Sequence, residues 1–283
     1  MKEYAYAKEL LFSQLGSQRK AGLAPVAIIN KDDAIFEQFG QATPAEVISY
    51  STTDASASFF ASDITYSKEG TQFTLHLMGD LYPVQINSFG EYNVQNALAA
   101  IAATWSLGIS LEVAIEALTE MQRVKGRLHP MANTEGYEVF VDYAHTPDGL
   151  ENVLHALRPL AKGRIISVFG CRGGRDKAKR PIMGKIATES ADFVVFTTDD
   201  PGNEDQEKII EMVLSGTEKE NYTYIEKRKT AIEYAVEMAE PGDIMVITGR
   251  GHEETYHIKG QEFHLIDYEI AQEAVNKKQR QIC

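Results

Sequence analysis

Residues 138–157 read EVFVDYAHTPDGLENVLHAL, and this stretch decides the fold class. It begins with a short apolar run over 138–142, which predicts a buried strand. Thr146 and Pro147 follow, a pair typical of a helix N-cap and first helical position, and apolar residues then recur at helical spacing over 147–160. The chain therefore passes directly from a strand into a helix, which is the unit of parallel α/β sheets.

The same alternation continues toward the C-terminus. Further strands are predicted over 164–169, 192–197, 222–225 and 243–248, and helices over 178–190, 205–215 and 228–239. Repeated β-α units favour an α/β fold with a Rossmann-like, doubly wound parallel sheet and helices on both of its faces. Ligands bind at the carboxyl ends of the strands in such sheets, so the loops after the strands are the candidate functional segments.

The preceding part of the chain has a different pattern. Three β-rich runs separated by glycine turns predict a small antiparallel patch, over 58–66, 72–78 and 82–86. Around this patch, a strand is predicted over 25–30 and helices over 3–16, 31–39, 93–107 and 111–121. Pro130, Asn133 and Gly136 punctuate the chain after them, so we predict one domain over 1–130 and a second over 131–283.

Composition narrows the class of protein. The 283 residues are 43% hydrophobic and 24% charged, which excludes collagen-like, disordered and disulfide-scaffold chains. A net charge of -13 argues against non-specific nucleic-acid binding. No run approaches the roughly 18 apolar residues of a membrane span, and Cys171 and Cys283 are expected to be free thiols of a reducing compartment. We expect a cytoplasmic protein without nucleic-acid or membrane partners.

Two of the predicted loops carry groups that suit anionic ligands. After the first strand, Asp142 and His145 are not needed for helix capping, so they predict a ribose or phosphate site. Five of the ten residues in 171–180 are basic and lead into a helix. Cations at a helix start oppose the macrodipole, so we favour an anion site over a merely solvated loop.

The other two loops are less specific. Residues 199–205 (DDPGNED) suit either a turn with an N-cap or a site for an amino group, and the sequence leaves both open. The G-x-G at Gly249 lacks the third glycine of a dinucleotide fingerprint. His252 and His257 are five residues apart rather than four, which excludes a metalloprotease helix. The phosphate-loop motif G-x-x-x-x-G-K-[ST] does not occur.

These loops, in this order, resemble the Mur ligase family, and within it the ligases that add the third residue of the peptidoglycan stem peptide. The resemblance covers essentially the whole chain. Among its anchors only DYAHTPD (142–148) is specific alone; the others are Tyr4-x-x-Ala7-Lys8-x-x-Leu11-Phe12, Gly90-x-x-Asn93-x-x-Asn96-Ala97, Gly126-Arg127, the 171–181 loop, Asp199-Asp200-Pro201 and Gly249-x-Gly251-His252-Glu253.

The resemblance implies a domain assignment and a reaction. Residues 1–130 would be the C-terminal part of the central ATP-binding domain, and 131–283 the C-terminal amino-acid-binding domain. The family's phosphate loop and N-terminal domain would lie upstream of Met1, so we expect a fragment of a longer ligase. The implied reaction is ATP- and Mg²⁺-dependent amide formation through an acyl phosphate. Its substrates would be UDP-N-acetylmuramoyl-L-alanyl-D-glutamate and free diaminopimelate or lysine.

The resemblance also implies roles for individual residues. Lys8 would be carbamylated, because a carbamate, unlike an ammonium group, can ligate magnesium. His145 would join Lys8 as a catalytic residue. The nucleotide would be bound by Asn93, Asn96, Arg127, Asp142 and His145. The incoming amino acid would be bound by Arg175, Asp199, Asp200, Pro201, Gly202, Gly249 and Glu253, with Arg175 on its carboxylate and Asp199 and Glu253 favouring its amino groups.

Departures from the family pattern leave the identity of the incoming amino acid open. Diaminopimelate ligases typically have D-N-P-R, but Gly202 occupies the arginine position here, which is nearer to the lysine ligases. Residues 249–253 look more like the diaminopimelate type, and His129 stands where glutamate is usual. An inactive ligand- or partner-binding remnant is the main alternative. Folylpolyglutamate or cyanophycin synthetases and Rossmann oxidoreductases fit the loops less well, and the oligomeric state stays open.

Overall fold

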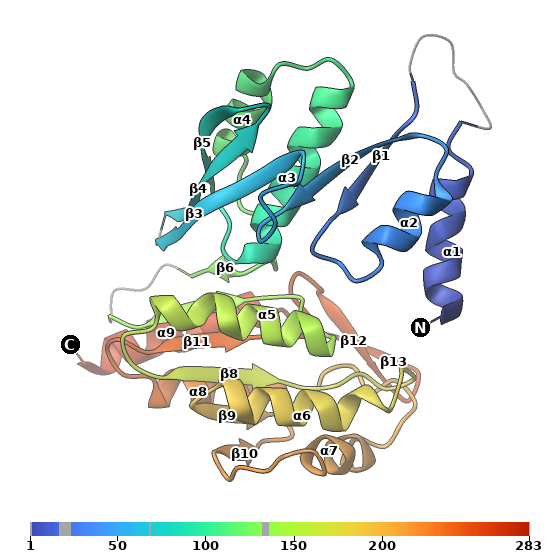
Figure 1. Cartoon of the computed structure of the whole chain (residues 1–283). Helices are drawn as coiled ribbons and strands as arrows, with labels where there is room; N and C mark the ends of the chain where they lie inside the picture. Colours follow the sequence, from blue (N-terminus) through green and yellow to red (C-terminus); the bar gives the residue numbers. More distant parts are fainter. Residues whose placement is uncertain (1, 17–23, 68, 132–135, 283) are drawn as a thin grey trace. The chain divides into compact units, whose positions relative to one another are not determined.

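The computed structural model describes residues 2–16, 24–67, 69–131 and 136–282. The chain forms two compact units, Met1–Gln122 and Arg123–Cys283, and each is described by itself (Figure 1). The predicted boundary after residue 130 falls inside the second unit, because β6 (His129–Pro130) pairs antiparallel with the second-unit strand β7 (Glu138–Val141). Asn133 and Cys283 lie outside the described residues.

The first unit contains a five-stranded sheet in the order β1-β2-β3-β4-β5. β1 (Val26–Asn30), β2 (Glu46–Ser51) and β3 (Phe59–Ser67) run parallel. β4 (Gly70–Leu77) and β5 (Asp80–Ile86) continue the sheet as antiparallel strands. The antiparallel patch is therefore confirmed, and β2 is a parallel strand that the sequence pattern did not reveal.

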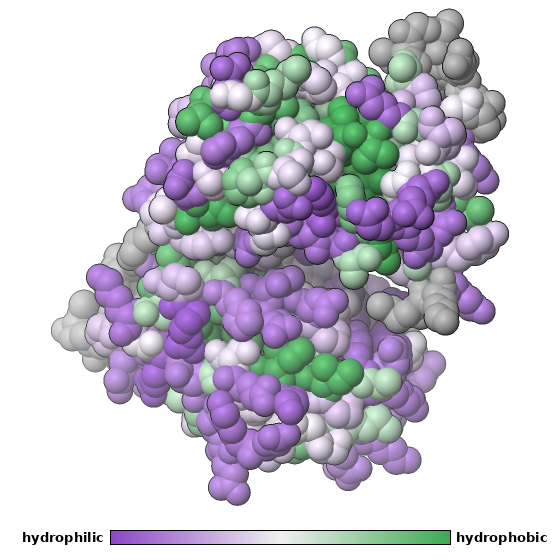
Figure 2. Space-filling model, in the orientation of Figure 1, coloured by the Kyte–Doolittle hydropathy of each residue, from purple (hydrophilic) through white to green (hydrophobic). Residues whose placement is uncertain are grey.

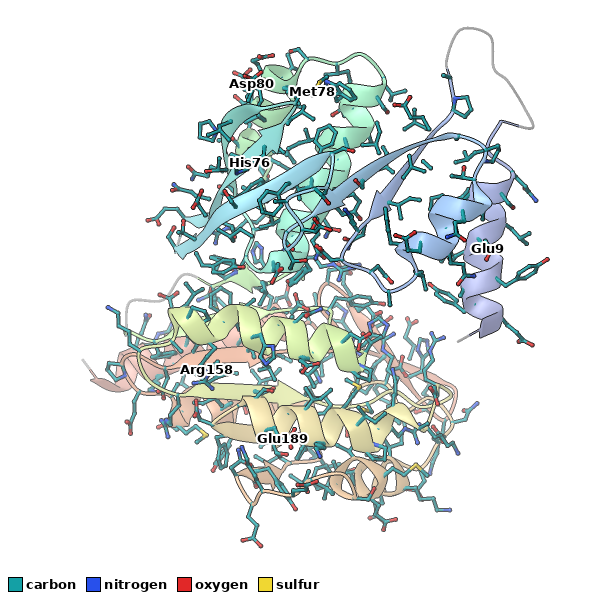
Figure 3. All side chains as sticks on the ribbon, in the orientation of Figure 1. Glu9, His76, Met78, Asp80, Arg158 and Glu189 are labelled. Atoms are coloured by element: carbon teal, nitrogen blue, oxygen red, sulfur yellow. The ribbon has the colours of Figure 1, made fainter. Side chains whose placement is uncertain are left out.

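Helices of the first unit are α1 (Lys2–Ser13), α2 (Phe36–Ala42), α3 (Glu91–Ser106) and α4 (Leu111–Glu120). α3 packs its apolar side chains into the same core as β3, β4 and β5. The helix predicted from residue 31 begins only at Phe36, because Asp33 holds a turn in which its side chain accepts a hydrogen bond from the Ile35 N–H at 3.0 Å. Met78, at the turn between β4 and β5, is 85% exposed (Figure 3).

The second unit is the doubly wound sheet that the sequence predicts. Its strand order is β10-β9-β8-β11-β7-β6, and all neighbours except β6 and β7 are parallel. The central strands are buried along their whole length, as is usual when helices cover both faces. Besides β7 the parallel strands are β8 (Ile165–Phe169), β9 (Phe193–Phe196), β10 (Tyr222–Tyr224) and β11 (Ile244–Ile247).

Helices cover the two faces of this sheet. α5 (Pro147–Leu157), the short 3-10 turn η1 (Arg158–Leu160), α6 (Lys179–Ser190) and α7 (Gln206–Leu214) lie together. α8 (Arg228–Met238) and α9 (Asp267–Ile282) share a core cluster with the strands, and Figure 1 shows α5 and α6 in front of the sheet and α8 behind it. An antiparallel hairpin, β12 (Thr255–Ile258) and β13 (Gln261–His264), follows β11.

The visible face of the second unit is mostly hydrophilic, with a smaller apolar patch (Figure 2). Within the ranges that the structure describes, no helix is both long enough and apolar enough to cross a membrane.

Candidate functional site at the strand ends

Loops after four parallel strands meet at one edge of the second-unit sheet, which we call the strand-end site. They contact one another through backbone atoms. A Cβ on Gly170 would lie 2.2 Å from the Thr197 carbonyl oxygen, and one on Gly173 would lie 1.9 Å from the Pro201 carbonyl oxygen. Glycine is therefore required where these loops cross, and the crossings bring the predicted loops together.

Asp142 is buried at this edge, and its carboxylate faces inward. It accepts hydrogen bonds from the backbone N–H groups of Leu128 and Ala144, both at 2.7 Å. Burial raises the pKa of the Asp142 carboxyl despite these two donors. Both oxygens are engaged within the chain, so Asp142 positions the segment that carries Arg127 rather than presenting its carboxylate at the surface.

Arg127 and His145 flank the Tyr143 ring. Arg127 is exposed, with its guanidinium carbon 5.4 Å from the ring centroid, and the His145 ring makes an edge contact at 4.8 Å. The His145 Nδ1 lies 3.0 Å from the Tyr143 carbonyl oxygen, which can only accept. Nδ1 therefore donates this hydrogen bond, and Nε2 is the other ring nitrogen.

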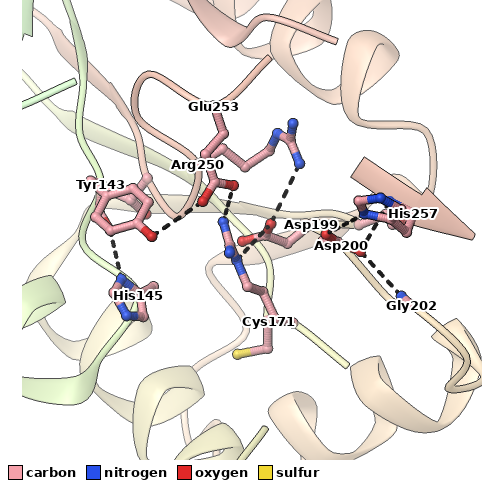
Figure 4. A network of polar contacts seen from close by, with 12 residues as sticks. Tyr143, His145, Cys171, Asp199, Asp200, Gly202, Arg250, Glu253 and His257 are labelled. Atoms are coloured by element: carbon pink, nitrogen blue, oxygen red, sulfur yellow. Dashed lines mark hydrogen bonds and ion pairs between the residues drawn. The ribbon is translucent and has the colours of Figure 1, made fainter. Parts of the chain in front are cut away.

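A chain of polar contacts links Tyr143 to the buried centre of the site (Figure 4). The Tyr143 hydroxyl donates to Glu253 Oε1 at 3.2 Å, and Arg172 donates to the other oxygen of Glu253. Arg172 Nε also lies 3.5 Å from Asp199 Oδ1. The sequence prediction included Glu253 and Asp199 but missed Tyr143 and Arg172; the signal for Arg172 was its place as the first charged residue after β8.

Asp199 is enclosed without hydrogen bonds. Among the described residues neither of its oxygens has a hydrogen-bond partner, although Arg172 Nε and Arg250 Nη1 lie 3.5 and 3.9 Å away. Burial raises the pKa of the Asp199 carboxyl. Gly249 is needed beside it, because a Cβ there would lie 2.5 Å from Asp199 Oδ2.

Asp267 is a second buried acid in the same unit, and both of its carboxylate oxygens accept hydrogen bonds. Asp267 receives two hydrogen bonds from Arg228, both at 2.7 Å, and both side chains are almost completely buried. Arg228 also donates to the carbonyl oxygens of Thr198 and Thr248, at 3.3 and 2.9 Å. This fork-to-fork pair is the geometry that arginine and carboxylate prefer.

Asp200, Pro201 and Gly202 form a turn that is fixed to β12. Asp200 Oδ1 accepts from the backbone N–H groups of Gly202 and His257, at 3.2 and 3.1 Å. Gly202 has a φ of 57°, which favours glycine, and its N–H also donates to the His257 carbonyl oxygen at 2.9 Å. Pro201 is buried beneath this turn. These contacts account for the DDPG loop as a turn, and a role toward an amino group stays a prediction.

The carboxylate of Glu204 neutralises part of the positive charge of the basic loop, residues 171–180. Glu204 accepts from Arg180, from Lys177 at 2.9 Å and from the Gly174 N–H at 2.9 Å. The Arg180 hydrogen bond, followed by those from Lys177 and Gly174, lowers the pKa of Glu204 to about 2.

One cation of the basic loop therefore remains a candidate for binding an external anion. Arg172 pairs with Glu253, and Lys179 donates to the His145 carbonyl oxygen at 2.6 Å. Only Arg175 of the five cations has no partner among the residues that the structure describes, and it is exposed.

Cysteine and potential metal-ligand groups were compared among the described residues. Cys171 is a free, buried cysteine, and burial raises the pKa of its thiol to about 12. No group of three or more His, Cys, Asp and Glu side chains in the described ranges could hold a metal ion. His252 lies in a turn and His257 in β12, so the two do not share a helix.

Predicted residues of the first unit lie on helices. Asn93 and Asn96 occupy the first turns of α3, where Asn93 Nδ2 donates to the Phe89 carbonyl oxygen at 2.7 Å. Asn96 Nδ2 lies 3.5 Å from Asn93 Oδ1, and Asn96 is exposed. Lys8 is exposed on α1, with its Nζ 5.4 Å from the Tyr4 ring centroid.

Comparison with known families identifies the class. The family model "Mur ligase, glutamate ligase domain" matches residues 126–251, and "Mur ligase middle domain" matches residues 1–104. The chain belongs to the Mur ligase family, and the predicted family is confirmed.

Two curated relatives are similar to this chain over nearly its whole length. The UDP-N-acetylmuramoyl-L-alanyl-D-glutamate--2,6-diaminopimelate ligase of Bacillus cereus is 40% identical over 276 residues, covering 97% of this chain and 56% of the relative. The ligase of the same name from Listeria monocytogenes is 40% identical, covering 97% of this chain and 55% of the relative. The chain therefore spans about half the length of the curated relatives it matches.

Solved structures agree on the fold. One of a UDP-N-acetylmuramoyl-L-alanyl-D-glutamate--2,6-diaminopimelate ligase superposes with a TM-score of 0.63 at 32% identity, covering 98% of this chain and 57% of that one. A pseudomurein peptide ligase type C from Methanothermus fervidus superposes with a TM-score of 0.70, covering 98% of this chain and 59% of that one. At 19% identity, the second likeness concerns the fold alone.

Proposed function

We propose that this chain belongs to an ATP-dependent ligase of peptidoglycan precursor synthesis, which joins a third amino acid to UDP-N-acetylmuramoyl-L-alanyl-D-glutamate. The amino acid is diaminopimelate or lysine. The observation that carries the proposal is the strand-end site, where Glu253, Arg172 and Tyr143 form one hydrogen-bonded group. The names of the relatives, which are 2,6-diaminopimelate ligases, support the same assignment.

The chemistry requires an amine to attack an acyl phosphate and expel phosphate. Among the described residues of the basic loop 171–180, Arg175 is the exposed cation without a partner, so it suits the carboxylate of the incoming amino acid. Glu253 accepts one donor on each oxygen and retains further lone pairs, with which it orients the amino group. Tyr143 and Arg172 hold Glu253 in place.

Residues suited to binding a nucleotide are proposed for each unit by itself. Arg127 and the Nε2 of His145 lie beside Tyr143 and present polar groups suited to phosphate and ribose. Asp142 acts behind them by fixing the backbone next to Arg127. Asn93 and Asn96 on α3 supply amide groups that suit a nucleobase.

Among the described residues, we propose Lys8 as a protein ligand for magnesium. Lys8 Nζ has only an aromatic neighbour among the described residues, so it is open to carbamylation. A carbamate at Lys8 would supply the anionic oxygen that Mg²⁺ prefers. Bound magnesium would offset negative charge on the phosphates.

Release of ADP and formation of the tripeptide product test the proposal. The chain is assayed alone and with the N-terminal portion of the Bacillus cereus relative. We expect product only in the complemented mixture, and Arg175→Ala should raise the KM for the amino acid. Arg158→Ala, which removes another exposed arginine of the same unit, is the matched control.

Two results would contradict parts of this proposal. A complemented mixture that releases no ADP while the chain still binds the amino acid would favour the inactive remnant. An unchanged KM in Arg175→Ala would remove that residue from the site.

A further inference from the structure

Two carboxylates of the strand-end site share one arginine. Arg172 donates to Glu253 through Nη2, and its Nε lies 3.5 Å from Asp199 Oδ1. An N–H···O hydrogen bond spans about 2.7–3.2 Å, so the contact with Asp199 is an ion pair that falls short of a hydrogen bond. Arg172 therefore forms a hydrogen bond with one acid and lies within a small side-chain movement of the other.

Asp199 is the acid that lacks hydrogen bonds. Its side chain is completely buried, and neither oxygen has a hydrogen-bond partner among the described residues. The Nε of Arg172 is likewise buried and has no hydrogen-bond partner within the same ranges. Native structures leave few buried polar atoms unpaired, because each unpaired atom costs free energy. A hydrogen bond from Arg172 to Asp199 would satisfy a donor and an acceptor together.

The other two arginines near Asp199 are held in place by other groups. Arg228 is paired with Asp267 through two hydrogen bonds. Arg250 lies 3.9 Å from Asp199 (Figure 4), but it is completely buried and donates to two backbone carbonyl oxygens of the hairpin segment. Of these three side chains, that of Arg172 is the most exposed, at 14%. Arg172 is therefore the arginine best able to change its partner.

An incoming amino group would compete with Arg172 for Glu253. Glu253 Oε2 accepts from Arg172, and Oε1 accepts from the Tyr143 hydroxyl at 3.2 Å. An ammonium group on Oε2 would lie beside the guanidinium group, and like charges in a partly buried site repel each other. When Arg172 shifts to Asp199, Oε2 becomes free. The hydrogen bond from Tyr143 still holds the Glu253 carboxylate in its orientation.

We infer that Arg172 is a positioning residue with two alternative carboxylate partners. In the structure it pairs with Glu253, and it transfers its donors to Asp199 when an amino group binds Glu253. Asp199 acts on the amino acid indirectly, as the acceptor for the displaced arginine. This inference rests on the proposed function, which places the amino group of the incoming amino acid at Glu253.

Calorimetric titration of the full chain with 2,6-diaminopimelate and, separately, with L-lysine tests this exchange of partners. Arg172→Met removes the competing cation, so the amino acid should bind about fivefold more tightly. Asp199→Asn removes the second carboxylate and leaves Arg172 on Glu253, so the amino acid should bind about fivefold more weakly. The double variant Arg172→Met/Asp199→Asn has no arginine to displace and should bind as tightly as Arg172→Met.

Two further variants serve as controls. Arg158→Met removes an exposed arginine of the same unit, which pairs with Asp192, and should leave both affinities within about twofold of the wild type. Arg172→Lys keeps a competing cation and should also stay within about twofold. If Asp199→Asn does not fold, the contrast between Arg172→Met and Arg172→Lys decides instead.

Opposite shifts in the two single variants distinguish the exchange from a purely structural role, because damage to the site weakens binding in both. Weaker binding in both, unchanged binding in both, or a wild-type chain that binds neither amino acid would overturn the inference. The ligase function is judged separately by ADP release in the complemented mixture. ADP release without the opposite shifts would leave that function standing and remove the exchange, whereas opposite shifts without ADP release would do the reverse.

Discussion

In the second unit the candidate residues Glu253 and Asp142 are held by other groups, whereas Lys8 and Asn96 of the first unit stand at exposed helix positions. Glu253 is held by two side chains, and Asp142 by two backbone N–H groups. Lys8 touches only an aromatic ring among the described residues, and Asn96 approaches only Asn93. Substitutions of Glu253 or Asp142 should therefore change folding as well as ligand binding, and those of Lys8 or Asn96 only ligand binding.

The two units can be followed separately. The chain has one tryptophan, Trp105, which lies on α3 in the first unit and packs against Phe59. Its fluorescence reports unfolding of the first unit. Hydrogen exchange of β8 and β11 peptides reports the second unit, because fully buried strands exchange through the largest openings.

The largest effect is expected from Arg228→Ala. This change leaves Asp267 buried and charged without its two hydrogen bonds. Breaking one side of a buried ion pair costs about 3–5 kcal/mol. Hydrogen exchange of β8 and β11 should accelerate by the corresponding factor while Trp105 fluorescence keeps its unfolding midpoint.

An exposed pair supplies the control for that prediction. Arg158 and Asp192 are 2.9 Å apart, and their side chains are 44% and 42% exposed. Exposed pairs contribute about 0–1 kcal/mol, so Arg158→Ala should change exchange little. If both arginine substitutions accelerated hydrogen exchange equally, the distinction between buried, paired residues and exposed residues would be wrong.

Asp142→Asn should have the next largest effect. An amide has one oxygen, so either the Leu128 or the Ala144 N–H would face the NH₂ group and lose its acceptor, at a cost of about 1–3 kcal/mol. The raised pKa of Asp142 also determines the direction in which stability changes with pH. Its contribution to stability is complete below the unfolded value of 3.8 and is lost as pH rises through the folded value.

The pH dependence separates these two contributions. With rising pH, the free energy of unfolding of the wild type should fall relative to that of Asp142→Asn, as measured by hydrogen exchange of the second unit. A difference between the two proteins that stays constant with pH would show that Asp142 does not titrate in this way.

Glu204→Gln should destabilise the second unit at neutral pH, and this effect should disappear in acid. Hydrogen bonds from Arg180, Lys177 and Gly174 lower the pKa of Glu204 from 4.5 to about 2. Its contribution is therefore present above 4.5 and is lost as pH falls toward about 2. Urea unfolding of the second unit between these values should show a shallower loss for Glu204→Gln than for the wild type, and Glu220→Gln, an exposed glutamate, should match the wild type.

Sequence patterns predicted the parts of the fold that local signals specify. Each parallel strand of the second unit except β10 is a short buried run, and Thr146 caps α5 as expected, with its hydroxyl accepting from the Gly149 N–H at 3.2 Å. β2 and the β12–β13 hairpin were missed. β2 is only partly buried, and β13 is exposed at every position, so neither shows a continuous apolar run.

The edge that carries the site was predictable, but its internal pairing was not. Parallel strand order alone places the four loops together. Arg172 and Glu253 are 81 residues apart, and Tyr143 and Glu253 are 110 apart. Such pairs depend on loop conformations that periodicity does not report. The inward orientation of Asp142 was hidden for the same reason, because it depends on where the Leu128 N–H comes to lie.

The smallest effect on folding is expected from Lys8→Ala. Lysine and alanine have similar helix propensities, and Lys8 is exposed with only the Tyr4 ring nearby among the described residues, so the first unit should change by less than about 0.5 kcal/mol. In the complemented ligase assay, however, most product formation should be lost, and Lys8→Gln, which keeps length but cannot be carbamylated, should lose as much. A shifted Trp105 unfolding midpoint would show that Lys8 has a structural role after all. Full activity in both variants would instead remove the carbamate from the proposed mechanism, and the first unit's contribution would then rest on Asn93 and Asn96.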